Sequence, residues 1–407
     1  MTEHLDSDDA HRAARDAART SYGRLVALVA AQIGDVAAAE DALSDAFEAA
    51  LRTWPARGVP DSPDAWLLTT ARRRAIDEVR RSSIAQRAQP ALALLADEHL
   101  NDDHTGAITD KRLELLFACA HPAIEPRVRT PLMLQVVLGL DVARMASAFL
   151  VAPSTLGQRL VRAKRKIRDA GIGFRIPDAD ELPDRLDAVL DAIYGGYTAG
   201  RAGDDPPRAH VTTEAIRLTR VVNELLPEHP ETLGLMALVL YTEARRPAAR
   251  DVTGRFVPLA EQDTTQWDEA LVDEADAALS RAARAGFVGP FGLEAHIQSV
   301  HMQRRHTGST DWRTIRGLYD TLLLVSPTVG ARVAAAGAAL EADGPEAALR
   351  RLDEVADEAA AYQPWWAVRG HALRRLGDGD AHATLQRAAG MTDDAAVRSY
   401  LLDLADR

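Results

Sequence analysis

The chain has 407 residues and a net charge of −12, and at roughly 150 residues per domain this length predicts two or three domains. Hydrophobic residues make up 47% and aromatic residues only 5% of the chain, which excludes a disordered protein. The abundance of Ala, Leu, Arg and Glu predicts an almost all-α fold. No apolar run reaches the roughly 18 residues that a membrane span needs, and the acidic start lacks the pattern of a signal peptide. The chain has a single cysteine, Cys119, which excludes an intramolecular disulfide. We therefore expect a soluble, cytoplasmic protein without membrane contact.

The negative charge is unevenly distributed along the chain. Residues 1–170 carry equal numbers of acidic and basic side chains, so the whole net charge of −12 falls on residues 171–407. Because an acidic surface repels phosphate, we expect any contact with nucleic acid in the first part.

Two helices are predicted near the start. Apolar residues with helical spacing run from Leu25 to Ile33, and this pattern ends near Gly34. A second helix is predicted from Ala39 to Trp54, and Pro55 is expected to stop it.

The second of these helices carries an acidic stripe. Asp41, Asp45 and Glu48 follow one another at steps of three or four residues, so they share one side, and Phe47 lies toward the other. Such a stripe does not attract DNA, but it can dock on a basic protein surface. A solvated helix face is the alternative.

A basic helix is predicted from about Asp64 to Arg81, with Ser62 and Pro63 at its start. An aromatic residue near its beginning is followed by five arginines: Trp66, Arg72, Arg73, Arg74, Arg80 and Arg81. Arginines beside an aromatic ring can hold an unstacked DNA strand through phosphate contacts and base stacking. The alternative is that Trp66 belongs to the hydrophobic core.

A helix-turn-helix is predicted at Asp141–Arg168. Its first helix spans Asp141–Phe149, a break follows at Val151–Pro153, and Ser154 is expected to cap the second helix. Four apolar residues of the second helix should face the core: Leu156, Leu160, Ala163 and Ile167.

The remaining side of this second helix is polar and cationic. The predicted DNA-binding residues are Ser154, Thr155, Gln158, Arg159, Arg162, Lys164, Arg165 and Lys166. A helix that enters the major groove with its N-terminus first presents Thr155, Gln158 and Arg159 to base edges and its later cations to phosphates. A solvated basic face is the alternative.

The last part of the chain is predicted to form a series of consecutive helices. Val329–Ala342 is predicted to pair with Glu346–Ala361, and Trp365–Leu376 with Ala381–Ala389. Pairs that repeat at roughly 34–40 residues indicate tetratricopeptide-like units, with an irregular helical bundle as the alternative.

Nothing in the sequence favours an enzyme. His296, His301 and His306 look like a metal cluster, but five-residue steps on a helix place each about 140° from the last, so they do not share a face. Cys119 and His121 have no third partner in the sequence, and there is no glycine motif for phosphate. We expect no catalysis, no cofactor and no metal.

The acidic, the basic and the helix-turn-helix elements, in this order, resemble a sigma factor of the sigma-70 family, extracytoplasmic-function class. Ala39–Phe47 resembles the region-two helix that binds the clamp of RNA polymerase. Ala65–Leu68 with Arg72–Arg81 resembles the part that opens and reads the minus-ten element, and Val151–Lys164 resembles the region-four helix that reads the minus-thirty-five element.

The tail resembles a sigma subgroup with a tetratricopeptide-like C-terminal extension. The resemblance rests on Gln266–Asp268, Thr310–Ile315, Leu318–Tyr319 and Ser326–Pro327. In that subgroup the extension is implied to be needed for activity. The chain departs from the usual residues at three places: Ser44, Gly195–Tyr197 and Ala331–Arg332.

The resemblance implies four segments: a region-two domain at 10–82, a linker at 83–109, a region-four domain at 110–172 and a regulatory extension at 184–407. It implies core RNA polymerase, through its clamp and flap, and promoter DNA as partners, with a possible contact between the tail and the sigma domains. The function expected is promoter-directed transcription initiation regulated by the extension. The alternative is a helix-turn-helix regulator with a helical-repeat sensor domain.

Overall fold

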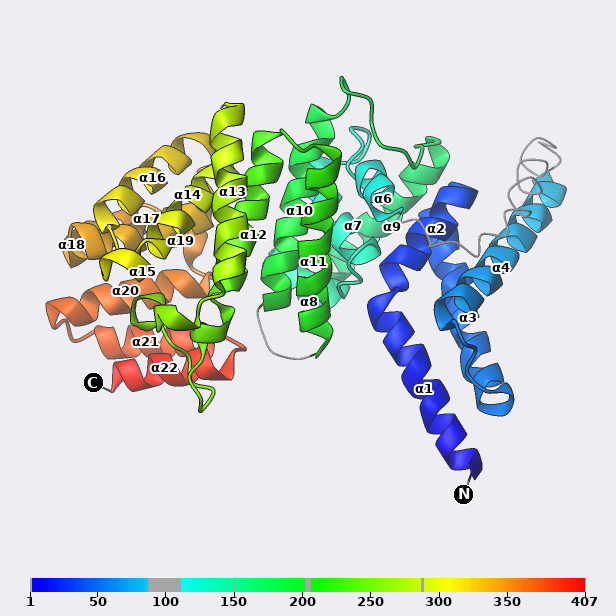
Figure 1. Ribbon diagram of the computed structural model, residues 1–407, viewed down its shortest axis with the longest axis horizontal. Helices are drawn as coiled ribbons and strands as arrows, with labels where there is room; N and C mark the ends of the chain where they lie inside the picture. Colours follow the sequence, from blue (N-terminus) through cyan, green and yellow to red (C-terminus); the bar gives the residue numbers. More distant parts are fainter. Residues whose placement is uncertain (1, 87–110, 150, 202–205, 287–288, 407) are drawn as a thin grey trace. The chain divides into compact units, whose positions relative to one another are not determined.

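The computed structural model describes residues 2–86, 111–149, 151–201, 206–286 and 289–406 (Figure 1). Regular structure in these ranges is helical, apart from one isolated β-bridge between Arg250 and Phe256. The predicted all-α fold is confirmed. The chain forms two compact units, the first ending at Leu218 and the second beginning at Thr219. Among the described residues, no helix combines the length and apolar character that a membrane crossing requires.

The first unit begins with a module of four helices: α1 (Thr2–Thr20), α2 (Tyr22–Ile33), α3 (Val36–Arg57) and α4 (Pro63–Gln86). The acidic start of the chain did not predict α1, because its core-facing residues are small rather than strongly apolar. Ala10, Ala14 and Ala17 are buried, and α1 packs on α3. A stripe of alanines lets the two helices approach closely.

The prediction that Pro55 stops α3 is wrong. Asp35 caps the start of the helix by accepting from the N–H groups of Ala37 and Ala38, and the helix runs through Pro55 to Arg57. It ends at Gly58, whose positive φ of 82° turns the chain and whose N–H donates to the Trp54 carbonyl. Proline removes one backbone hydrogen bond, and this loss is tolerated in the last turn of a helix that is packed on its neighbours.

The next four helices are α6 (Arg112–Cys119), α7 (Pro126–Val136), α8 (Val142–Ala148) and α9 (Pro153–Asp169). Asp141 accepts from the Ala143 N–H at the start of α8, and α8 packs against α9. The prediction that Ser154 caps α9 is wrong, because the helix begins one residue earlier, with Pro153 in its first turn and Ala152 as the cap residue. Proline suits that position because its fixed φ is already helical. The predicted linker at 83–109 lies largely outside the described residues.

The first unit continues beyond residue 172 into α10 (Pro183–Arg201) and the first part of α11 (Pro206–Leu225). Helix α10 packs against α7, and a Cβ atom added at Gly196 would overlap the side chain of Leu138. Arg112 of α6 forms an ion pair with Glu214 of α11. The run Gly195–Tyr197 therefore lies where the tail meets α7, and its glycine permits the close approach.

The second unit is a succession of packed helices. They are α12 (Pro230–Ala244), α13 (Glu269–Ala285), α14 (Pro290–Met302), α15 (Arg304–Thr307), α16 (Trp312–Val325), α17 (Val329–Ala342), α18 (Pro345–Asp353), α19 (Ala356–Ala359), α20 (Gln363–Leu376), α21 (Ala381–Gly390) and α22 (Ala395–Ala405), with 3-10 turns η2 (Arg246–Ala249), η3 (Leu259–Glu261) and η4 (Thr264–Gln266). Four pairs pack together, α12 with α13, α14 with α16, α17 with α18 and α20 with α21, and α22 packs on α21. The two helix pairs predicted after residue 329 are present, except that the helix predicted at Glu346–Ala361 is interrupted and forms α18 and α19.

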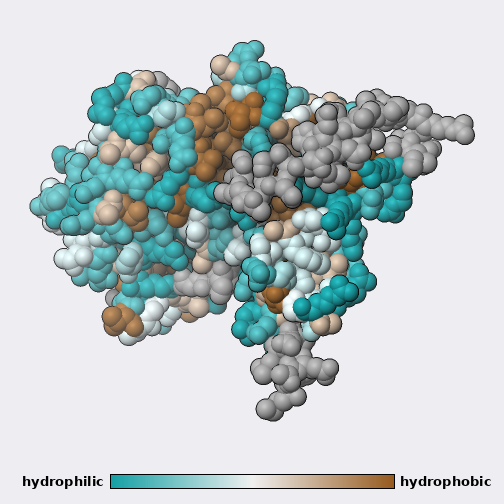
Figure 2. Space-filling model, turned by 45° about the vertical axis from the view of Figure 1, so that its right-hand side comes forward, coloured by the Kyte–Doolittle hydropathy of each residue, from teal (hydrophilic) through white to brown (hydrophobic). Residues whose placement is uncertain are grey.

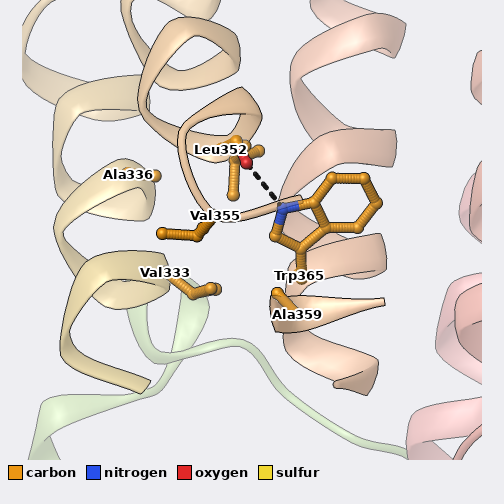
Figure 3. Close-up of a cluster of buried hydrophobic side chains, with 6 residues drawn as sticks. All are labelled: Val333, Ala336, Leu352, Val355, Ala359 and Trp365. Carbon is orange, nitrogen blue, oxygen red and sulfur yellow. Dashed lines mark hydrogen bonds between the residues drawn. The ribbon is translucent and has the colours of Figure 1, made fainter. Parts of the chain in front are cut away.

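One buried cluster shows how these pairs are joined (Figure 3). The ring of Trp365 lies among side chains from the neighbouring helices and their turns, and its Nε1 donates to the Leu352 carbonyl at 3.0 Å. The other members are Val333, Ala336, Val355 and Ala359. On the face drawn in Figure 2, most of the surface is hydrophilic, as expected when amphipathic helices turn their apolar sides inward.

The segment 246–268, between α12 and α13, reaches the far end of the second unit. Arg250 forms an ion pair with Asp394 at 2.9 Å, Arg255 with Asp403 at 2.8 Å, and Phe256 packs on Tyr400 with 5.4 Å between ring centroids. The first helix pair is thereby tied to the last helix.

Trp365→Ala is expected to lower the free energy of unfolding of the second unit by about 3–5 kcal/mol, because it empties a buried ring site and removes the indole donor to the Leu352 carbonyl. Urea unfolding followed by circular dichroism measures the loss. Leu324→Ala is the control, since that side chain is 85% exposed and its removal should cost no more than about 0.5 kcal/mol. Equal losses in the two variants would contradict the packing described.

Candidate nucleic-acid and protein interfaces

The predicted acidic stripe lies on the open side of α3. Asp41, Asp45 and Glu48 are exposed, Phe47 is half-buried, and the opposite side of the helix is buried in the core through Leu43 and its neighbours. Asp45 pairs with Arg74 of α4 at 2.9 Å. Because packing fixes the buried side, the carboxylates keep their orientation toward solvent, where a basic surface can approach them.

The arginines of α4 fall into two groups. Arg73, Arg80 and Arg81 are exposed, whereas Arg72 and Arg74 are half-buried. Arg74 is held by Asp45, and burial lowers the pKa of Arg72. In the exposed group, Arg81 also pairs with Glu78 at 3.2 Å, and in the half-buried group Arg74 joins α4 to α3.

The start of α4 is fixed by contacts with α2 and α3. Asp64 accepts from the Ser21 hydroxyl and the Arg24 guanidinium, which join it to α2. Trp66 is half-buried and packs edge-on against the fully buried Trp54, with 5.5 Å between ring centroids. The Trp66 ring thus contacts the core and also keeps part of its surface open, so the two roles considered for it do not exclude each other.

The second helix of the predicted helix-turn-helix, α9, buries the expected residues. Leu156, Leu160, Ala163 and Ile167 lie in the core. The exposed side carries most of the predicted DNA-binding residues: Ser154, Thr155, Gln158, Arg162, Arg165 and Lys166 are exposed, and Arg159 is half-buried.

Val161 is a residue of this side that the sequence reasoning missed. It is 56% exposed among polar and cationic neighbours. The helical period gives the signal, since Val161 follows Gln158 by three residues and precedes Arg165 by four. An apolar side chain in that position offers a surface for the methyl group of thymine.

Lys164 does not lie on the exposed side of α9. It is 8% exposed, and its Nζ donates to Glu40 Oε2 of α3 at 2.6 Å. Arg168 lies 3.5 Å from Asp35 at the start of the same helix. The reason is helical spacing, because Lys164 follows the buried Leu160 by four residues and thus shares its side. In this structure the charge of Lys164 is directed to α3 rather than to a phosphate.

Cys119 lies beside this ion pair in a fully buried position. Burial raises the pKa of its thiol to about 12, while the charges of Lys164 and Glu40 act on it in opposite directions. A thiol with such a pKa stays protonated at neutral pH and is a poor nucleophile.

The three histidines of the second unit have different surroundings. His296 and His306 line a cavity of about 390 Å³ together with Tyr241, Asp276 and Arg305. His301 is buried and packs on Trp312, and this burial lowers the pKa of His301 to about 3. In the parts of the chain that the structure describes, no three His, Cys, Asp or Glu side chains are grouped as metal ligands would be.

Comparison with known proteins identifies the first module of the chain. Residues 18–84, which contain α2, α3 and most of α4, match the family model "Sigma-70 region 2". The "Probable ECF RNA polymerase sigma factor SigI" of Mycobacterium tuberculosis is 25% identical over 165 residues, which are 40% of this chain and 56% of that protein. Residues 18–84 therefore form a sigma-70 region-two domain.

A second relative is similar to the chain over most of its length. The "Uncharacterized protein R00370" of Rhizobium meliloti is 35% identical over 373 residues, which are 89% of this chain and 88% of that protein. Residues 185–283, which begin in α10 and end in α13, match a family of unknown function, DUF6596. No solved structure matches the chain.

Cys119 is expected to resist alkylation by iodoacetamide in the native chain from pH 7 to pH 9, because its buried thiol remains protonated throughout this range. Mass spectrometry measures the modified fraction with time, and unfolding in guanidinium chloride should restore the rate of an ordinary thiol. An Ala170→Cys variant, with an exposed second thiol, is the control for reagent activity. Rapid modification of native Cys119 would contradict its buried position.

Proposed function

We propose that the chain is an RNA polymerase sigma factor of the extracytoplasmic-function class that directs core polymerase to specific promoters. The observation that carries the proposal is the position of two opposite charge patterns within the sigma-70 region-two match. Exposed carboxylates lie on α3, and exposed arginines lie on the neighbouring α4. A protein that must bind both an enzyme and a nucleic acid needs both patterns.

The proposed polymerase contact is the exposed side of α3. Asp41, Asp45 and Glu48 offer carboxylates to a basic surface, which we assign to the polymerase clamp, and the half-buried Phe47 adds apolar area at the edge. Charge complementarity of this kind speeds encounter and sets orientation. The flap is proposed as the second polymerase contact, made by the module α6–α9.

The minus-ten element is proposed to bind at α4. Arg73, Arg80 and Arg81 are exposed for phosphate contacts, and the open part of Trp66 can stack on an unpaired base. Arg72 and Arg74 lie closer to the core and support the helix from which the others project.

The minus-thirty-five element is proposed to bind at α9. Thr155, Gln158 and Arg159 near its N-terminus would meet base edges in the major groove, and Arg162, Arg165 and Lys166 would meet phosphates. Loss of one base-reading side chain should cost about 1–3 kcal/mol and relax specificity locally. Neither step forms or breaks a covalent bond, so we propose an initiation factor and not an enzyme.

The second unit is proposed to regulate this activity. Its helices pack in successive pairs, and the first helices of the last three pairs begin at Pro290, Val329 and Gln363. These intervals are close to the roughly 34 residues of a tetratricopeptide repeat. Stacks of such repeats form concave surfaces that bind proteins and peptides.

An Asp41→Arg variant is expected to weaken binding to core polymerase roughly tenfold, or about 1.4 kcal/mol, because it replaces an exposed carboxylate of the docking side with a cation. Fluorescence anisotropy of the labelled chain with core polymerase measures the affinity. Asp273→Arg makes the same charge change at an exposed position of α13, outside both modules assigned to the polymerase, and should bind as the unaltered chain does. A chain that fails to bind core polymerase at all would favour the helix-turn-helix regulator instead.

A chain ending at Leu225 is expected to lose at least about fivefold in run-off transcription with core polymerase, a difference of about 1 kcal/mol, because it lacks the regulatory unit. This end point keeps α10 and α11, which pack on α7 and pair with Arg112. A chain ending at Ile176 would also uncover that face of α7, so it would mix a loss of stability with a loss of regulation. Thermal unfolding confirms that the shortened chain is folded, and unchanged transcription from it would remove the regulatory proposal.

A further inference from the structure

A groove in the second unit lies between α13 and α14. Both helices pack on α12 along much of their length, whereas they contact each other over a smaller part (Figure 1). The cavity in this groove has a volume of about 390 Å³. Small-molecule sites in proteins have volumes of roughly 300–1,000 Å³, so the cavity is large enough to hold a small ligand.

One face of each helix lines the groove. The lining residues recur at intervals of three, four or seven residues: Asp276, Ser280 and Ala283 on α13, and His296, Ser299 and His306 on α14 and α15. The buried side chains of Tyr241, Leu279 and Met302 form the floor. Two of the three histidines that the sequence singled out therefore belong to this cavity, whereas His301 is buried in the core.

A series of polar contacts runs along the wall. The fully buried Tyr241 donates its hydroxyl proton to Asp276 Oδ1, and Asp276 Oδ2 lies 3.6 Å from Arg305 Nη2. Arg305 Nε donates in turn to His306 Nε2 at 2.9 Å. Because core packing holds Tyr241, the half-exposed carboxylate of Asp276 is kept in one position at the mouth of the groove.

The lining offers both hydrogen-bond donors and acceptors. His296 Nδ1 lies 2.8 Å from the Gly292 carbonyl, which only accepts, so Nδ1 carries the proton and Nε2 of the neutral ring is an acceptor. His306 has the opposite arrangement, because its Nε2 accepts from Arg305 and its Nδ1 is then the donor. Ser299 donates to the His296 carbonyl, and its hydroxyl oxygen keeps its lone pairs as acceptors.

The lining has no net charge when the imidazoles are neutral. Asp276 and Arg305 carry opposite charges, and the other lining side chains are uncharged. A groove that attracts an anion or a cation needs an excess of one sign, which this groove does not have. Hydroxyl groups both donate and accept, so they match a neutral wall of this composition, and the apolar side of a sugar ring can pack on Leu279 and Met302.

We propose that the groove between α13 and α14 binds a small, uncharged, polyhydroxylated molecule, a sugar or a polyol. The carboxylate of Asp276 accepts from one hydroxyl of this ligand, and the guanidinium of Arg305 donates to another. Hydrogen bonds to ionised groups are stronger than those between neutral groups, so these two contacts carry most of the affinity. The inference concerns the second unit by itself and stands independently of the proposed function.

Saturation-transfer NMR with the full chain tests the proposal. The probes are glucose, galactose, ribose, trehalose and myo-inositol, which present hydroxyl groups in different arrangements. At least one of them should bind with a dissociation constant of about 1 mM or below, as expected for roughly a dozen ligand atoms. Inorganic phosphate and putrescine, an anion and a cation, should bind more weakly than this sugar or polyol.

Two variants place the binding in the groove. Ala283→Trp should abolish it, because an indole at this lining position fills the cavity, whereas Ala277→Trp, at an exposed position of α13 outside the lining, should not affect it. Asp276→Asn keeps the shape of the side chain and an acceptor for Tyr241, but it removes the charged acceptor and should weaken binding at least about tenfold. Asp273→Asn, the same change at an exposed position outside the lining, is its control.

A probe that binds Ala283→Trp or Asp276→Asn as tightly as the unaltered chain would have its site elsewhere, and this result would overturn the proposal. Absence of binding by all five probes at about ten times the expected dissociation constant would overturn it too, as would tighter binding of phosphate or putrescine than of every sugar and polyol. Thermal unfolding confirms that the variants are folded. If Ala283→Trp does not fold, the nearly isosteric Asp276→Asn decides the outcome.

Discussion

Close approach between helices at small residues is the constraint on which both units depend. With aromatic residues at only 5%, the chain fills its core mainly with alanine and leucine, and such helices must lie near one another to exclude water. Gly23 meets the Val137 backbone, Gly234 lies against Gly292, and Gly370 lies against Leu385. At each place a side chain would push two helices apart.

Within that scaffold, charge is sorted by helix face. Helix α3 buries Leu43 and exposes Asp41, while Asp45 divides its role between solvent and Arg74 of α4. The same holds for α9, where Arg165 is exposed to solvent, whereas Lys164 forms an ion pair with Glu40 of α3. Neighbouring residues of one cationic run therefore have different partners, and a count of positive charges does not distinguish them.

Helical periodicity accounts for what the sequence predicted well. The buried face of α9, the acidic side of α3 and the helix pairs of the second unit all follow from apolar residues at steps of three and four. Boundaries were less reliable. Pro55 was expected to end α3 and Ser154 to cap α9, but a proline in a packed last turn is tolerated, and a proline at a helix start can open the helix itself.

Contacts between modules could not be predicted from helical periodicity. That Lys164 is buried follows from its spacing to Leu160, but its partner Glu40 lies 124 residues away, and no local pattern connects them. The same holds for α10, because the need for glycine at position 196 is visible only from its contact with the side chain of Leu138. Helix α10, which contains Gly195–Tyr197, packs on α7 within the first unit.

The segment 246–268 gives the second unit an order of assembly. Its arginines find their carboxylates at Asp394 and Asp403, which follow 144 and 148 residues later in the chain. During translation the early helix pairs can stack as they emerge, but the bridge across the unit must wait until α22 has emerged. The bridge opposes separation of α22 from the stack, so it should protect this helix from local unfolding and from proteases that attack unfolded segments.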